Sequence, residues 1–154
     1  MLVNGSGGTF PRAWNLRVFQ SLFSTKLGPL TGAPPVRRVK SYSAQSGYVY
    51  RYSYEGQRRF PSHPRPDRNA GVEFVFRVAT VGQDWRPVGV LVFDAAVRDW
   101  EQAHGRELSS PERYAIAKMA LFQAFDERPK PARLKAPIQV RAADVEAILE
   151  TLGA

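Results

Sequence analysis

The stretch Gly47–Gly56, with the sequence GYVYRYSYEG, decides the fold predicted for this chain. Tyrosine occupies every second position in it, which is the period of a β-strand. The four tyrosines are Tyr48, Tyr50, Tyr52 and Tyr54. Because side chains alternate between the two faces of a sheet, the pattern predicts all four phenol rings on one face, in a strand that ends at Gly56.

This tyrosine stripe has two interpretations. Exposed rings would offer stacking platforms for nucleobases or an adhesive protein surface, since every base has a π-face. Alternatively, tyrosine suits a half-buried sheet, in which aromatic side chains on neighbouring strands stabilise one another. The sequence leaves both interpretations open, and they predict different exposure of the rings.

Three more strands are predicted after the tyrosine stripe. Apolar residues at every second position predict a strand over Val72–Thr80, and Val88–Phe93 is apolar on both faces, as is typical of a strand inside a sheet. The connections between these strands are short, which favours antiparallel pairing. A short edge strand is predicted at Pro137–Val140.

The second half of the chain has helical periodicity. A helix is predicted over Ala95–His104, with Asp94 as its N-cap. The longest helix follows Ser109, which forms a capping box with Glu112, and a last helix is predicted over Ala142–Leu152. The predicted fold is therefore α+β: a single domain, over residues 41–154, in which an antiparallel sheet of three or four strands is packed by two or three helices.

Residues 1–40 form a basic N-terminal extension that is rich in glycine and proline, and most of it is predicted to be loop. Within it, the spacing of apolar residues predicts a short amphipathic helix over Trp14–Leu27. Three roles are open for this helix: docking on the core of the domain, acting as an organelle transit peptide, or binding an anionic membrane or a groove of a partner.

The apolar runs of the chain are short. The longest, Val88–Phe93, falls far below the roughly 18 residues that span a bilayer, and the N-terminus lacks the apolar run of a secretory signal. We therefore expect no transmembrane segment and a cytoplasmic protein, or an organelle-matrix protein if residues 1–40 are a transit peptide.

Positive charge is concentrated in the first half of the chain. Residues 1–70 hold eleven basic and two acidic residues, a net charge of +9, whereas residues 71–154 hold eleven basic and twelve acidic residues, a net charge of −1. This asymmetry indicates that a basic surface meets an anionic partner.

The segment from Gln57 to Ala70 is predicted to be a proline-punctuated loop that carries four arginines. Guanidinium groups match phosphate and carboxylate geometry, and the prolines lower the entropy lost when the loop binds. The segment is therefore a candidate contact surface. Equally, it fits a solvated hairpin loop whose charges keep a sheet edge soluble.

No catalytic chemistry is predicted. The chain has no cysteine, its two histidines lie in separate elements, and no cofactor, metal or nucleophile motif is present. The function predicted is a non-catalytic binding module for a polyanion, with nucleic acid as the expected partner and an acidic protein as the alternative. The candidate binding residues are Arg37, Arg38, Lys40, Arg51, Arg58, Arg59, Arg65, Arg68, Tyr48, Tyr50, Tyr52 and Tyr54.

Overall fold

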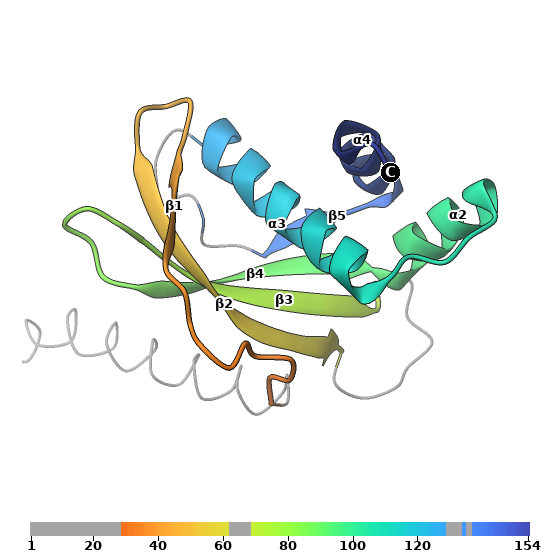
Figure 1. The fold of residues 1–154 in the computed structure, drawn as a ribbon, viewed down its shortest axis with the longest axis horizontal. Helices are drawn as coiled ribbons and strands as arrows, with labels where there is room; N and C mark the ends of the chain where they lie inside the picture. The colour runs from red at the N-terminus through yellow and green to blue at the C-terminus, as the bar shows by residue number, and fades with distance from the viewer. Residues whose placement is uncertain (1–28, 62–68, 129–133, 135–136) are drawn as a thin grey trace, which may run out of the picture.

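The computed structural model describes residues 29–61, 69–128, 134 and 137–154. The helix expected over Trp14–Leu27 lies outside these residues. Five strands and three helices are described, and Figure 1 shows how they are arranged. In chain order they are β1 (Lys40–Ser43), β2 (Val49–Phe60), β3 (Gly71–Thr80), β4 (Arg86–Phe93), α2 (Asp94–His104), α3 (Ser110–Glu127), β5 (Ile138–Val140) and α4 (Ala142–Leu152).

The α+β class is confirmed, but the sheet differs from the prediction. It has five strands, in the order β1-β2-β3-β4-β5, and it is mixed. Strands β1 to β4 pair antiparallel, as the short connections predicted, whereas β5 pairs parallel to β4. The parallel pairing follows from the two helices between β4 and β5, because a chain needs such a crossover to re-enter a sheet in the same direction.

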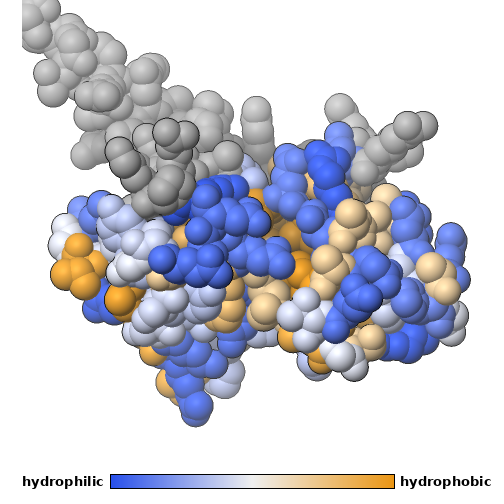
Figure 2. All heavy atoms as spheres, turned by 90° about the horizontal axis from the view of Figure 1, so that it is seen from above, coloured by the Kyte–Doolittle hydropathy of each residue, from blue (hydrophilic) through white to orange (hydrophobic). Residues whose placement is uncertain are grey.

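The helices lie together on one face of the sheet, which we call the inner face (Figure 1). Seen from this side, the described surface is largely hydrophilic, and hydrophobic residues show in patches between the hydrophilic ones (Figure 2). The core fills the space between α3 and the inner face, where burial of apolar surface stabilises the fold. Its most deeply buried large side chains include Tyr50, Phe76, Ile116, Leu121 and Phe125.

The sequence predicted that this strand ends at Gly56, but β2 continues to Phe60. Its register with β3 shifts between Tyr54 and Gly56, so one extra residue is accommodated there in a β-bulge. Gly56 has φ of 131°, and a Cβ at this position would lie 2.7 Å from the backbone oxygen of Thr31. Glycine therefore bends the strand here without ending it, because only glycine tolerates both the dihedral angle and the close approach.

The ends of the helices test the predicted capping residues. The capping box of Ser109 and Glu112 is present at the start of α3, with both of its hydrogen bonds. The N-cap predicted at Asp94 is wrong: Phe93 is the N-cap of α2, and no side chain caps it. Asp94 is the first residue of α2, and its carboxylate binds Arg59 instead.

Among the described residues, no helix combines the length and the apolar character needed to cross a membrane.

Candidate nucleic-acid interface

The tyrosine stripe lies on the inner face and is covered by α3. Tyr50 is fully buried and Tyr52 is 4% exposed, so neither ring has a face open to a base in this structure. Tyr54 is half-buried, with its ring 4.9 Å from that of Tyr114. Tyr48 precedes β2 and is 41% exposed, which leaves it as the accessible member of the stripe.

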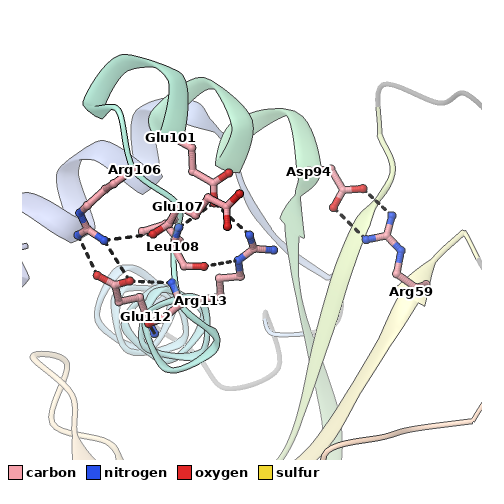
Figure 3. Close-up of polar contacts among 9 residues, drawn as sticks. Arg59, Asp94, Glu101, Arg106, Glu107, Leu108, Glu112 and Arg113 are labelled. Atoms are coloured by element: carbon pink, nitrogen blue, oxygen red, sulfur yellow. Dashed lines mark hydrogen bonds and ion pairs between the residues drawn. The ribbon is translucent and has the colours of Figure 1, made fainter.

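Two arginines of the predicted loop, Arg58 and Arg59, lie in β2 instead, so their placement in a loop is wrong. Arg58 points to the outer face of the sheet, where its Nε donates to Oε2 of the buried Glu73 at 2.8 Å. Arg59 points to the inner face and binds both carboxylate oxygens of Asp94 (Figure 3). Both arginines lie in a strand because β2 continues past the bulge at Gly56. There Arg58 pairs with Glu73 of β3, and Arg59 pairs with Asp94 of α2.

The Arg58–Glu73 ion pair is built into the outer face at the centre of the sheet. Side-chain exposure is 13% for Arg58 and 6% for Glu73. Gly89 of β4 provides the space, because a Cβ there would lie 2.2 Å from Oε1 of Glu73. Breaking a pair that is buried to this extent leaves one buried charge without a counterion, which destabilises the protein. These residues therefore contribute to the fold rather than to an open binding surface.

The cations before β2 are more accessible. Arg37 is 61% exposed and its guanidinium lies 2.9 Å from Glu55, while Arg38 and Lys40 are exposed as well. Arg65 and Arg68 lie outside the described residues. Of the predicted cations that the structure describes, Arg37, Arg38, Lys40 and Arg51 remain available to a ligand.

Arg51 belongs to a cluster that the sequence reasoning missed, which we call the tryptophan–arginine cluster: Arg51, Arg77 and Trp85. Its members come from β2, from β3 and from the turn before β4. The guanidinium carbon of Arg51 lies 5.2 Å from the Trp85 ring centroid, and that of Arg77 lies 5.4 Å from it. Both distances are those of cation–π contacts.

Sheet geometry explains why these three side chains meet on the outer face. In the β2–β3 register Arg51 faces Ala79, and Ser53 faces Arg77, so the two arginines are diagonal neighbours. Ala79 is small and 3% exposed, which leaves room above it for the indole. The contact of Arg77 with Trp85 depends on the register of the β3–β4 hairpin, which places Val78 opposite Arg86.

The cluster is electrostatically positive. Glu55 lies 3.7 Å from Nε of Arg77 and 2.9 Å from Arg37, and Asp84 precedes Trp85 in the chain, so with Arg51 three arginines outnumber two carboxylates. Cation–π stacking holds a guanidinium plane in place while its N–H edge stays free to donate to an oxyanion. The arrangement can thus bind phosphate or carboxylate groups beside an aromatic ring.

A cavity of about 240 Å³ lies on the inner face, between β2, β3 and the first turns of α2 and α3. Val72, Phe74, Val97 and Leu108 give it apolar walls. Its charged groups are already paired: Asp94 with Arg59, and Arg113 with Glu101 and the backbone oxygen of Leu108 (Figure 3). The cavity therefore offers a ligand apolar contact but no unpaired charge.

In the described part of the chain, no three histidine or carboxylate side chains are grouped so that they could hold a metal ion. His104 stacks on Trp100, with centroids 4.2 Å apart, and its Nε2 lies 3.0 Å from Glu146 of α4. That contact ties α2 to α4 at the surface.

No protein-family model, curated protein or solved structure matches this chain.

Proposed function

We propose that this protein is a non-catalytic module that binds single-stranded nucleic acid on the outer face of its sheet. The proposed surface consists of the tryptophan–arginine cluster together with Arg37 and Arg38. The observation that carries the proposal is one indole within cation–π distance of two guanidinium groups, on the face of the sheet opposite the helices.

The residue types match what single strands require. Proteins that bind single strands combine cations that follow the phosphate backbone with aromatic rings on which bases stack. Arg51 and Arg77 are both exposed, and Trp85 is half-buried, so part of the indole stays accessible. Arg37 and Arg38 extend the positive surface along the segment that leads into β1.

The buried tyrosines have no part in this proposal. Tyr50 and Tyr52 serve the core, and Trp85 takes the stacking role for which they were candidates. The net charge of +9 over residues 1–70 supports the attraction of a polyanion, and all eleven of its cations precede β3.

The test is a titration of the full chain with a fluorescent single-stranded 12-mer at several salt concentrations. If about four phosphates are neutralised, the log–log salt slope is about −3. Arg51→Ser and Arg77→Ser should each weaken binding severalfold and flatten the slope. Arg98→Ser is the matched control, because it removes one exposed positive charge from α2, on the helix side of the sheet.

Substitutions of Trp85 distinguish a nucleic-acid partner from an acidic protein partner. Trp85→Phe keeps a ring and should retain most of the affinity, whereas Trp85→Leu should lose roughly tenfold, since stacking contributes about 1 to 3 kcal/mol per base. Polyglutamate serves as the competing probe. Binding of polyglutamate as tightly as the oligonucleotide, with no effect of Trp85→Leu on either, would contradict the proposal in favour of an acidic protein.

A further inference from the structure

Two lysines meet on the inner side of the sheet, at its β1 edge, and no carboxylate among the described residues pairs with either of them. Lys40 begins β1, directly opposite Tyr52 in the β1–β2 register. Lys118 of α3 lies over the same ring: its Nζ is 6.0 Å from the Tyr52 centroid and 5.7 Å from that of Phe122. Because residues opposite one another in a sheet point to the same face, the two ammonium groups converge on one aromatic floor.

This lysine pair is electrostatically unfavourable by itself. Lys118 is half-buried, and burial, followed by the positive charge of Lys40, lowers the pKa of its ammonium group. Like charges at close range repel, and they repel more strongly where water is partly excluded. A fold that keeps both ammonium groups together leaves a site whose charge is unbalanced.

The other titratable groups that the structure describes around the pair do not balance its charge. The phenols of Tyr52 and Tyr114 are neutral at physiological pH, since burial raises the pKa of both. Asp126 lies two turns further along α3, about 12 Å away at 1.5 Å per residue. Its two carboxylate oxygens accept hydrogen bonds from the Tyr42 hydroxyl at 2.6 Å and from the Gln45 backbone N–H at 3.0 Å.

We propose that Lys40 and Lys118 form a binding site for a phosphate group, which bridges the two ammonium groups above the rings of Tyr52 and Phe122. A dianionic phosphate supplies enough negative charge and enough acceptor oxygens for both lysines at once. The aromatic floor provides apolar contact for whatever carries the phosphate. The site is independent of the proposed function, because it lies on the inner face and shares no residue with the tryptophan–arginine cluster.

The experiment is thermal unfolding of the full chain at pH 7, in chloride and in inorganic phosphate buffers of equal ionic strength. Phosphate should raise the melting temperature of the wild type, because a ligand that binds the folded state stabilises it by mass action. Lys40→Gln and Lys118→Met should each weaken phosphate binding about tenfold or more. Arg98→Gln, which also removes one exposed positive charge, should respond to phosphate as the wild type does.

In chloride, the phosphate-site proposal and a purely structural role of the lysines predict opposite changes in the melting temperature of the two lysine variants. Because each substitution removes the repulsion, both variants should melt at least as high as the wild type when phosphate is absent. A purely structural role for the lysines would lower both melting temperatures instead. Lys118→Met keeps an apolar stem on the rings, and Lys40→Gln lies at an exposed strand edge, so at least one variant should fold.

The source of the phosphate group is decided by two further probes, a nucleoside monophosphate and the single-stranded 12-mer. If Lys40→Gln weakens both, the phosphate belongs to a nucleic acid that crosses the β1 edge. If it weakens the mononucleotide alone, the site takes a small phosphorylated molecule. Identical melting curves of the wild type in chloride and phosphate, or equal phosphate responses in all four proteins, would overturn the proposal.

Discussion

The rings of Tyr50 and Phe125 stack with their centroids 4.0 Å apart and their planes 6° from parallel. Tyr50 comes from the most regular strand of the sequence, and Phe125 from the last turn of α3. Both side chains are completely buried. This contact fixes α3 on the sheet and removes Tyr50 from any role at the surface.

The hydroxyl of Tyr50 gives an unusual prediction, because it is buried and no described residue is hydrogen-bonded to it. A buried hydroxyl without a partner costs about 1 to 3 kcal/mol. Tyr50→Phe should therefore leave stability unchanged or raise it by about 1 kcal/mol, whereas Tyr50→Ala should lower it by about 3 to 5 kcal/mol. Urea denaturation measures both, and a clear loss of stability in Tyr50→Phe would show that the hydroxyl has a partner.

The buried ion pair of Arg58 and Glu73 should respond asymmetrically to substitution. Arg58→Met leaves the Glu73 carboxylate without this partner and should cost about 3 to 5 kcal/mol of unfolding free energy. The double variant Arg58→Met with Glu73→Leu should recover most of that loss, because two apolar side chains replace two charges. A double-mutant cycle by urea denaturation tests this, and additive losses would refute it.

The capping box predicts a modest and local effect. Ser109 accepts a hydrogen bond from the backbone N–H of Glu112, and the Glu112 carboxylate accepts one from the backbone N–H of Ser109. Ser109→Ala should destabilise the protein by about 1 kcal/mol. Ser110→Ala is the matched control, since Ser110 is already within α3, and it should change stability much less.

Alkaline pH should destabilise the fold through its tyrosines. The hydrogen bond to Asp126, followed by burial, raises the pKa of Tyr42 to about 12, and burial raises the pKa of Tyr54 to about 12. Their ordinary pKa is 10.0, so between pH 10 and 12 the unfolded state loses protons that the folded state keeps. The stabilisation is complete below pH 10 and is lost as the pH rises towards 12.

Denaturant titrations between pH 8 and 12 measure this loss, and absorbance at 295 nm reports the ionisation of the phenols. Tyr42→Phe should lose less stability over this range than the wild type, because one of the shifted groups is absent. Equal losses in both proteins would contradict the role assigned to the Tyr42–Asp126 hydrogen bond.

Local patterns predicted most of the elements. The strand expected over Val72–Thr80 is β3, with one more residue at its start, and the helix expected over Ala142–Leu152 is α4, with the same bounds. These segments are regular enough for their own periodicity to specify them. The box of Ser109 and Glu112 acts within one turn, so it was visible without any tertiary information.

What the sequence did not reveal depends on partners far along the chain. Strand β1 has four residues and exists because it pairs with Val49–Tyr52 across a hairpin. Aspartate is a residue type that is common at N-caps, but the carboxylate of Asp94 binds the guanidinium of Arg59, which lies 35 residues earlier in the chain. The meeting of Arg51 with Trp85, and of Lys40 with Lys118, depends on strand register and helix docking, which one-dimensional spacing does not encode.

The bulge at Gly56 makes β2 sensitive to the parity of its length. Up to Tyr54 the even-numbered side chains face the helices, and from Gln57 onward the odd-numbered ones do. Glu55 is the residue without a partner in the β2–β3 register, so deleting it would leave Gly56 opposite Val75, Arg58 opposite Glu73 and Arg59 on the side of the helices. Deleting Gly56 as well would carry the Arg58 charge beneath the helices and turn Arg59 away from them, so Glu73 and Asp94 would lose their counterions together. At this bulge, therefore, we expect the loss of two residues to be more damaging than the loss of one.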